Sequence, residues 1–349
     1  MAMPDISEKS YWLDGDLESV KACPACGEPA SVFRYEGLED HLEGVPGKWG
    51  IRHCAKCESL FLDPRPTISS IGKAYSSASY FTHQSGGAMH AADNGGSVVW
   101  RLANGYLNAR FGCQRKPFNS MGRWLVPWIV PIRQQLDYFY RHLPRQGARL
   151  LDVGCGNGAF LLRAMEAGWK VFGVEPDPAA AKQAKAAQLI VHNGDIHSYS
   201  PDGTFDVITL SHVFEHLHDP SDVLLRCFEL LNPGGVLWMA MPNADGLGQK
   251  IYRSAWFALD PPRHLFLPSR RELKRLCSYA GFSEVRLLRR GRSGSAGMRL
   301  STMRAEKLGM PFGTNSFLSS ALWNSVVNIV SIFSTRWSDE IVITAIKPK

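Results

Sequence analysis

One stretch near the middle of the chain constrains its fold more than any other. From Leu150 the sequence reads Leu-Leu-Asp-Val-Gly-Cys-Gly-Asn-Gly-Ala-Phe, an apolar run that ends in three glycines. A buried strand that turns sharply into a helix produces this pattern, because the turn needs backbone angles that glycine adopts without strain. The unpaired N–H groups at the start of the following helix can bind a polar or anionic ligand. The stretch therefore predicts a strand, turn and helix that approach a ligand closely.

An acidic residue at the end of the next predicted strand narrows the choice of ligand. This second strand, residues 169–174, is followed by Glu175, twenty-three residues after Asp152. A carboxylate at the tip of the second strand of a βαβ unit is placed to accept hydrogen bonds from both ribose hydroxyls of a nucleoside. The string Gly-x-Gly-x-x-Ala from Gly154 also satisfies the loose dinucleotide fingerprint, so an NAD-dependent oxidoreductase is an alternative. The third glycine, Gly158, and the position of Asp152 argue against it.

Further motifs follow in a fixed order. Val-Glu-Pro-Asp begins at Val174, Gly-Asp at Gly194, Phe-Asp-Val-Ile at Phe205 and Leu-Asn-Pro-Gly-Gly at Leu231. In order and spacing the series resembles the class I S-adenosylmethionine-dependent methyltransferases, over residues 150–282. The resemblance implies an α/β fold with a Rossmann-like, doubly wound sheet, and S-adenosyl-L-methionine as the cofactor.

The resemblance also assigns roles to residues of the cofactor site. In that family the glycine loop holds the methionine end of the cofactor, the acid corresponding to Glu175 binds the ribose, and the acid corresponding to Asp195 faces the adenine amine. We therefore expect the cofactor to contact Asp152, Gly154, Cys155, Gly156, Glu175, Pro176, Asp195, Ile196, Ser211 and Val213.

Three histidines are candidates for catalysis. His212 and His216 belong to the turn after the fourth predicted strand, which in the family lies beside the methyl-donating sulfur. The string His-x-x-Glu-His also matches a metalloprotease pattern, but that pattern needs a zinc helix in another fold. Some relatives that modify quinone precursors bind a divalent metal in this turn; His212 stands where they carry a first acid, which argues against a metal here.

The third histidine, His264, lies in a loop stiffened by two prolines. In related enzymes a histidine on this loop faces the acceptor. Its near-neutral pKa suits it to remove a proton from a hydroxyl or a carbon acid, and we take it as the best candidate for a base. The alternative is a histidine that only fixes the loop by hydrogen bonds.

Four of the eight cysteines form two Cys-x-x-Cys pairs near the N-terminus. Two such pairs joined by a hairpin suit tetrahedral coordination of a structural zinc ion by the four thiolates of Cys23, Cys26, Cys54 and Cys57. Chance pairs or a redox pair are the alternatives. The other four are expected to be small buried residues: Cys113, Cys155, Cys227 and Cys277.

The segment after these pairs bears on the acceptor. The Asp-Pro-Arg-Pro run from Asp63, followed by Tyr75 and Tyr80, resembles the amino-terminal region of bacterial sugar and cell-surface-glycan methyltransferases. In those enzymes the zinc ribbon and the following helices cover the active site and help to hold the acceptor. The alternative is that this region only stabilises the fold and does not contact the substrate. The resemblance implies methylation of a sugar or glycan hydroxyl, or of a sugar carbon. A quinone-like or lipid small molecule methylated at the membrane surface is the second candidate acceptor.

The chain divides into three predicted parts. Residues 1–64 form a zinc ribbon, residues 65–145 a helical connecting or lid region, and residues 146–349 the methyltransferase domain with an insert at about 291–338. The intact cofactor motifs argue against a non-catalytic zinc-ribbon adaptor.

Two apolar segments and the overall charge bear on partners. Residues 124–132 and 317–333 are strongly apolar, and each is expected either to pack internally or to contact another surface, a membrane included. The latter segment places on one helical face the apolar residues Leu318, Leu322, Val326, Ile329, Val330 and Phe333. The chain has 39 Lys and Arg against 32 Asp and Glu but no compact basic run, so we expect no nucleic-acid partner. Without a signal peptide or a spanning segment, a cytoplasmic protein is expected, with possible peripheral contact to the inner membrane.

Overall fold

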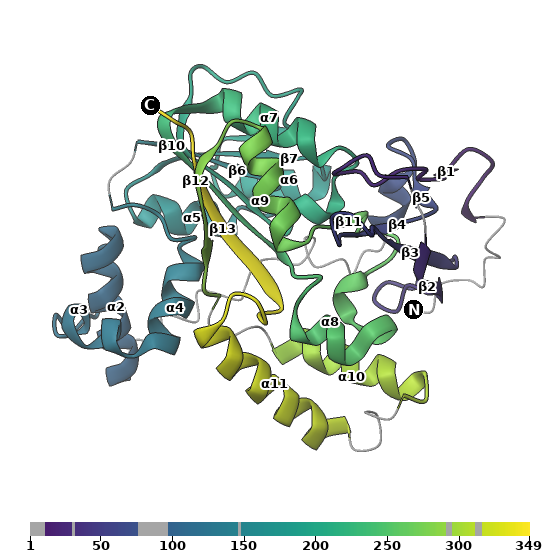
Figure 1. Ribbon diagram of the computed structural model, residues 1–349. Helices are drawn as coiled ribbons and strands as arrows, with labels where there is room; N and C mark the ends of the chain where they lie inside the picture. The colour runs from purple at the N-terminus through teal and green to yellow at the C-terminus, as the bar shows by residue number, and fades with distance from the viewer. Residues whose placement is uncertain (1–10, 30–31, 76–96, 146–147, 291–294, 311–315) are drawn as a thin grey trace.

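A seven-stranded sheet forms the centre of the computed structural model, which describes residues 11–29, 32–75, 97–145, 148–290, 295–310 and 316–349 (Figure 1). The strand order is β12-β13-β10-β9-β6-β7-β8, in which β6 to β10 run parallel and β13 is antiparallel to both of its neighbours. The strands are β6 (Arg149–Val153), β7 (Lys170–Glu175), β8 (Val191–Asn193), β9 (Phe205–Ser211), β10 (Leu231–Pro242), β12 (Ser283–Leu288) and β13 (Glu340–Ile346).

Helices cover both faces of this sheet. Because side chains alternate along a strand, neighbouring residues such as Leu150 and Leu151 enter different cores. The core around Leu151 is closed by α7 (Pro220–Leu230) and α9 (Arg270–Tyr279). The core around Leu150 is closed by α5 (Ala159–Glu166) and α6 (Pro178–Ala186). The predicted doubly wound α/β fold is confirmed.

The amino-terminal region builds a second sheet that borrows a strand from the methyltransferase part. Its order is β11-β4-β3-β2, where β11 (Phe266–Leu267) pairs with β4. The remaining strands of this region are β1 (Leu17–Glu18), β2 (Val32–Leu38), β3 (Trp49–His53), β4 (Leu60–Leu62) and β5 (Arg65–Pro66). Strands β4 and β5 are separated at Asp63, whose carboxylate accepts hydrogen bonds from the Val20 amide and from Arg52. The domain boundary at residue 64 stays a prediction.

A short helical region connects the two sheets. It consists of η1 (Ile71–Tyr75), α2 (Val98–Phe111), α3 (Gly122–Leu125), η4 (Val126–Trp128) and α4 (Val130–Phe139). The helix expected near Ser69 is the 3-10 helix η1. The helix expected over residues 133–143 is α4, which ends earlier because Arg141 and His142 have positive φ angles of 47° and 52°. Tyr80 lies outside the described residues.

The insert supplies two helices below the sheet in Figure 1. They are α10 (Ser295–Lys307) and α11 (Ser316–Phe333), and α10 contacts α8 (Leu247–Tyr252), η6 (Arg253–Ala255) and η7 (Phe257–Leu259). Helix α11 buries Val327 and Ser331 but exposes Leu322, Ile329 and Phe333. These three residues are not packed in the core, so contact with another surface stays the expectation for this side of the helix.

Candidate active site

The glycine turn after β6 has the geometry that its sequence predicts. Gly154, Gly156 and Gly158 all have positive φ angles, of 67°, 54° and 82°. A side chain at Gly154 would collide with Val213, and one at Gly158 with Leu189. A Cβ atom at Gly156 would meet nothing within 4 Å, so the turn presents open space there. A ligand can therefore approach the main chain at Gly156.

Glu175 is fixed beside this turn by its own hydrogen bonds. One carboxylate oxygen accepts the Gly156 amide at 2.7 Å and the other accepts the Asp177 amide at 2.8 Å. Burial raises the pKa of this carboxyl group, and the two amides oppose that shift. A carboxylate has lone pairs beyond these two bonds, so Glu175 retains the capacity to accept ribose hydroxyls.

The remaining expected cofactor residues differ in exposure. Asp195 is exposed, and backbone hydrogen bonds from Ser198 and His197 lower the pKa of its carboxyl group. Ile196 and Cys155 are buried, Pro176 is exposed, and Ser211 and Val213 are half-buried at the end of β9. All belong to the carboxyl ends of parallel strands, where ligands bind in such sheets. Their assignment to the cofactor stays a prediction.

Asp152 lies deeper than the other expected cofactor residues. It is fully buried, and its Oδ1 atom is bound by Arg141 and by the Thr209 hydroxyl, the latter at 2.8 Å. The Arg141 guanidinium also lies 3.7 Å from the centre of the Phe160 ring. The Oδ2 atom of Asp152 has no hydrogen-bond partner within the described structure. Asp152 is thus positioned by an arginine that the sequence motifs did not indicate.

The turn after β9 holds an ion pair. Glu215, in η5 (Phe214–His216), is fully buried and its Oε1 atom lies 3.2 Å from Nδ1 of His212. Burial alone would raise the pKa of Glu215, but the bond and charge of His212 outweigh it and lower the pKa to about 2. Burial lowers the pKa of His212, whereas Glu215 and Glu340 raise it by more. The protonated form of His212 is therefore favoured, which makes it a poor base.

The other two histidines face each other next to this pair. The rings of His216 and His264 lie 4.7 Å apart between centres, edge to face. Nδ1 of His216 lies 3.0 Å from the Arg263 carbonyl oxygen and 2.9 Å from the Tyr75 hydroxyl, and Nδ1 of His264 lies 2.7 Å from the Ala258 carbonyl oxygen. A carbonyl oxygen only accepts, so Nδ1 of each ring carries a proton, and Nε2 is the nitrogen left to exchange a proton with a ligand.

Backbone contacts join the histidine pair to the glycine turn. The Leu265 amide donates to the Glu215 carbonyl at 2.7 Å, which ties the His264 loop to the turn after β9. Val213, two residues before Glu215, packs against Gly154. The three candidate catalytic histidines and the expected cofactor turn therefore lie at one edge of the sheet.

Arg263 fixes the histidine loop to the amino-terminal region. This fully buried guanidinium donates to both carboxylate oxygens of Asp40 at 2.7 Å and to both of Asp260, at 2.6 and 3.0 Å. It also reaches the Ala74 carbonyl, one residue before Tyr75. Sequence reasoning missed Asp40, since nothing in its local sequence marks it, and it missed the role of Arg263 despite the Pro-Pro-Arg-His string.

Two groups of side chains have the composition and spacing of metal sites. Glu215, His216 and His264 each offer a ligand atom within 4.8 Å of the others, and Oε2 of Glu215 has no hydrogen-bond partner in the described part of the chain. Two imidazoles and a carboxylate can bind a divalent metal as well as act in proton transfer. The second group is the set of four cysteines near the N-terminus.

The four cysteines converge as the paired motifs predict. The Sγ atoms of Cys23 and Cys57 lie 3.6 Å apart, and those of Cys26 and Cys54 lie 3.5 Å apart. Zinc–sulfur bonds of about 2.3 Å in a tetrahedron separate the sulfurs by roughly 3.8 Å, so the four thiols fit zinc. Matching turns support both pairs, with the amides of Gly27 and Glu58 donating to the carbonyls of the first cysteines. The lone cysteines are buried, as expected.

The sheet order, the glycine turn and the acid at the end of β7 together define a methyltransferase fold of class I. Residues 131–287 match the family model described as a methyltransferase domain. This part of the chain is therefore similar to methyltransferase domains, and the fold class predicted from the motifs is confirmed.

Individual relatives agree with this class. The chain is 32% identical over 124 residues to a ubiquinone biosynthesis O-methyltransferase of Xanthomonas campestris, which covers 33% of this chain and 51% of the relative. The enzyme of the same description from Xanthomonas oryzae is 31% identical over 123 residues, with the same coverage. The chain spans about half the length of these curated relatives.

Among solved structures, a SAM dependent methyltransferase from Archaeoglobus fulgidus superposes with a TM-score of 0.43 and 23% identity, covering 63% of this chain and 94% of that chain. An S-adenosylmethionine dependent methyltransferase from Mesorhizobium loti superposes with a TM-score of 0.41 and 16% identity. The match covers 61% of this chain and 98% of that chain.

Proposed function

We propose that this protein is an S-adenosylmethionine-dependent methyltransferase that methylates a hydroxyl group. The observation that carries the proposal is the junction of the glycine turn, anchored to Glu175, with the His216–His264 pair. S-adenosylmethionine, when bound, would supply a methyl group on a positively charged sulfur. Open space at Gly156 and the carboxylate of Glu175 fit its amino-acid and nucleoside parts, and Asp195 is placed at the adjoining strand end.

His264 is the base in this proposal. Its Nδ1 proton is held by the Ala258 carbonyl, so Nε2 is free to accept the proton of an acceptor hydroxyl. The Asp260 carboxylate lies 3.9 Å from Nε2 and would stabilise the imidazolium that forms. His216 has its pKa lowered to about 4, chiefly by burial, and therefore stays neutral beside the charged His264. Alignment of acceptor and donor would supply the rest of the catalysis.

For the acceptor, a sugar or glycan hydroxyl is our first candidate. The groups around the histidine pair are polar: Tyr75, Asp260 and Glu215 all approach it. Such a lining suits a polyhydroxylated acceptor, because each hydroxyl needs a hydrogen-bond partner when it leaves water. The close packing of Tyr75 and of the ribbon residue Asp40 around the loop supports a role of the amino-terminal region in holding the acceptor.

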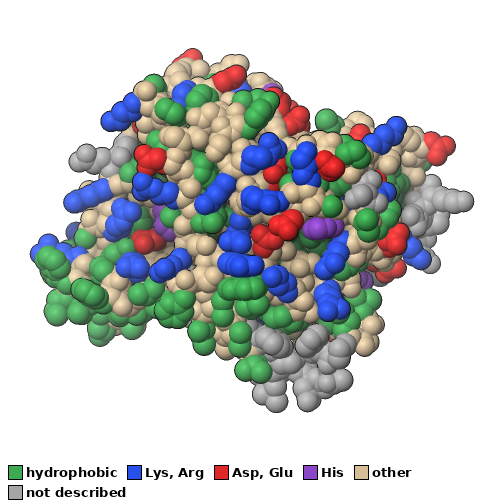
Figure 2. Space-filling view, viewed as in Figure 1, with side chains coloured by type: hydrophobic (Ala, Val, Ile, Leu, Met, Phe, Trp, Pro, Cys, Tyr) green, Lys and Arg blue, Asp and Glu red, His purple; other side chains and the backbone are tan. Residues whose placement is uncertain are grey.

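A quinone-like or lipid acceptor at a membrane surface is the second candidate, and an exposed apolar face favours it. Trp124 and Trp128, on α3 and η4, are 66% and 85% exposed. Phe118, Met121 and Ile129 are also exposed beside them, and α4 contacts α11 with its exposed Leu322, Ile329 and Phe333. Figure 2 shows hydrophobic side chains gathered over the region of α2, α3 and α4. Exposed apolar surface of this extent marks an interaction site.

The charge of this face complements an anionic bilayer. Residues 98–136 contain six Lys or Arg and no Asp or Glu, and Arg123 lies over the Trp124 ring. Tryptophans flanked by cations are typical of segments that sit in the membrane interface. Within the described residues, no helix is long and apolar enough to cross a bilayer. The curated relatives are named as O-methyltransferases of ubiquinone biosynthesis, which supports the same class of acceptor.

We also propose that Cys23, Cys26, Cys54 and Cys57 hold a structural zinc ion. Four thiolates without an open ligand position suit a structural rather than a catalytic site.

A labelled-methyl experiment tests the function. The protein is incubated with methyl-deuterated S-adenosylmethionine and with extract of cells that lack the gene, and mass spectrometry then searches for a compound that gains one labelled methyl group. We expect Glu175→Ala to weaken binding of S-adenosylmethionine by about 1.5–3 kcal/mol in calorimetry, the cost of lost hydrogen bonds to a charged group. His264→Gln should leave that binding intact and lower labelling by roughly 100-fold or more.

Controls separate the alternatives. Glu229→Ala, on the exposed side of α7, should change neither binding nor labelling. Tight binding of NADH in place of S-adenosylmethionine would favour an oxidoreductase and refute the proposal. Normal labelling by His264→Gln would make this residue a loop anchor.

A further inference from the structure

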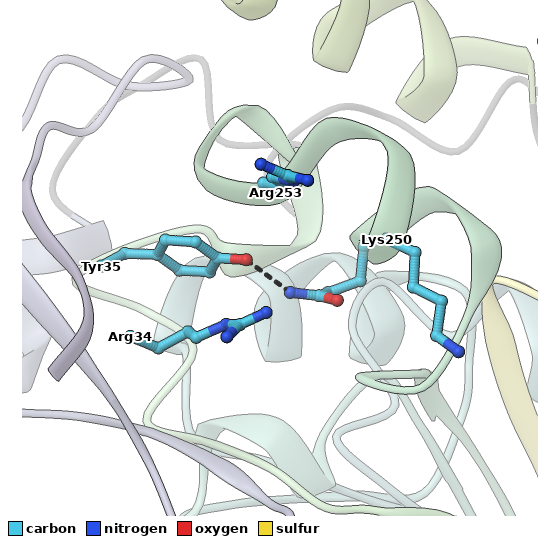
Figure 3. A pocket seen from close by; sticks show the side chains of 5 residues that line it. Arg34, Tyr35, Lys250 and Arg253 are labelled. Carbon is cyan, nitrogen blue, oxygen red and sulfur yellow. Dashed lines mark hydrogen bonds between the residues drawn. The ribbon is translucent and has the colours of Figure 1, made fainter. Parts of the chain in front are cut away.

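A cavity separate from the histidine pair lies between the amino-terminal sheet and α8. Its volume is about 360 Å³ and it is lined by Arg34 and Tyr35 of β2, by Gln249 and Lys250 of α8 and by Arg253 of η6 (Figure 3). Volumes of this size accommodate small-molecule ligands. None of these residues belongs to the expected cofactor site or to the catalytic candidates.

The charge of the cavity is uncompensated. Three of its five lining residues are cations and none is an acid. Across the part of the chain that the structure describes, Arg34, Lys250 and Arg253 form no ion pair. Two of these cations lie over aromatic rings. The Arg34 guanidinium lies 5.8 Å from the Tyr35 ring centre, and the Lys250 ammonium lies 4.2 Å from the Trp337 ring centre. Like charges that share one cavity repel each other, and a bound anion relieves that repulsion.

The floor of the cavity is fixed and offers a neutral donor. The buried Gln249 amide donates to the Tyr35 hydroxyl oxygen at 2.7 Å, which joins α8 to β2. Because the Tyr35 oxygen accepts this bond, its own proton is free to donate to a ligand. In Figure 3, Arg34 and Arg253 lie on opposite sides of this pair, while Lys250 extends away from it. The two guanidinium groups therefore flank the Tyr35 phenol at the cavity, with Lys250 adding to the local potential.

The backbone at Arg253 is unusual for an arginine. Its φ angle is +48° and its ψ angle −117°, a conformation that favours glycine. A side chain kept at such a position suggests a function for that side chain. Here the side chain reaches the edge of the cavity.

We infer that this cavity binds a phosphoryl group. Guanidinium groups match the oxygens of phosphate with paired hydrogen bonds, and two of them with a phenol suit a doubly charged phosphoryl group better than a single carboxylate. The phosphoryl group can belong to a soluble phosphate ester or to a lipid headgroup. The inference does not depend on methyl transfer.

Binding of inorganic pyrophosphate to the full-length, metal-loaded protein tests it, without S-adenosylmethionine. Calorimetry should show binding by the wild type that weakens as salt rises. Arg34→Ala and Arg253→Gly should each weaken it by roughly tenfold or more, as expected when a hydrogen bond to a charged group is lost. Glycine relaxes the backbone at position 253, so a loss there does not reflect misfolding. Arg286→Ala, an exposed arginine of β12 paired with Glu284, is the charge-matched control and should bind normally.

Vesicles of phosphatidylglycerol separate the two sources. If vesicle binding falls in Arg34→Ala and pyrophosphate displaces the vesicles, the site takes a lipid headgroup. If vesicles do not affect the binding of pyrophosphate, the ligand of the site is a soluble phosphate ester. Absence of pyrophosphate binding by the wild type, or equal loss in Arg286→Ala, overturns the inference.

Discussion

At the scale of single residues, buried charges organise the site more than the motifs indicate. Arg263 and Asp40 are 223 positions apart and both buried, and Arg141 reaches back to Asp152 across the start of β6. A buried charge needs a partner, yet a sequence does not say which acid of the chain a given arginine meets. The positions of the glycine turn and of Glu175 could be predicted from the spacing of the motifs, whereas these buried partners depend on tertiary packing.

The depressed pKa of His216 gives a test of this burial. Its pKa in the folded protein is lowered to about 4 from the 6.5 of an unperturbed histidine, chiefly because of burial. Between these values the unfolded chain binds a proton that the folded protein does not, so stability falls as pH drops from about 6.5 to about 4 and not further below. Denaturant unfolding should show that His216 accounts for about 2 kcal/mol of the loss between pH 7 and pH 5.

The comparison uses one variant and one control. His216→Gln should lose correspondingly less stability over that interval, while His192→Gln, on β8, should behave as the wild type. Equal losses in His216→Gln and the wild type would show that the ring is not held neutral.

At the scale of elements, the predictions succeeded where a period or a motif marked the sequence. The strands that flank the glycine turn and helices α5 to α7 and α9 lie where expected, since alternation of strand and helix patterns fixes them. Whether α11 packs internally or contacts another surface could not be predicted, because this helix carries no charged residue and no polar face contrasts with its apolar one. The pairing of β11 with β4 has no local signal, since two residues do not make a period.

Hydrogen bonds from α9 hold both cysteine turns in place. The Ser269 hydroxyl donates to the Cys57 carbonyl at 2.6 Å, and Arg275 donates to the Ala25 carbonyl at 2.9 Å. We expect one zinc per chain by elemental analysis, and Cys54→Ser should lose it and unfold at a lower temperature, since metal binding stabilises such a fold. The matched control is Cys277→Ala, at a lone buried cysteine of α9, which should keep its zinc. A metal-free wild type with unchanged stability would contradict the zinc assignment.

At the scale of the whole molecule, the exposed apolar face and the phosphoryl cavity are on different elements. Neither was predictable in position: the sequence marks residues 124–132 and 317–333 as apolar, but their exposure depends on which helix sides the sheet covers. Because the face formed by α3, η4 and α11 is apolar and exposed, binding to lipid vesicles is the property to measure.

We expect the protein to sediment with phosphatidylglycerol vesicles and less with phosphatidylcholine vesicles, because the basic segment is attracted to anionic lipid. Trp124→Ser with Trp128→Ser should weaken this binding by roughly tenfold or more, through loss of buried aromatic area. Tyr279→Ser, at an exposed aromatic of α9, serves as the control. Self-association that the tryptophan variant abolishes, without vesicle binding, would identify the face as a contact between two copies instead.

The Arg263 bridge limits how this protein can be recombined with its relatives. Asp40 and Arg263 are both fully desolvated, and removing one partner of a buried pair typically costs about 3–5 kcal/mol. A ribbon transplanted from another enzyme without an acid at the position of Asp40 would remove one of the two carboxylates that pair with this buried guanidinium and leave Asp260 as its partner next to His264. The ribbon and the histidine loop must therefore be exchanged together, although strands β6 to β10 of the seven-stranded sheet lie between them along the chain.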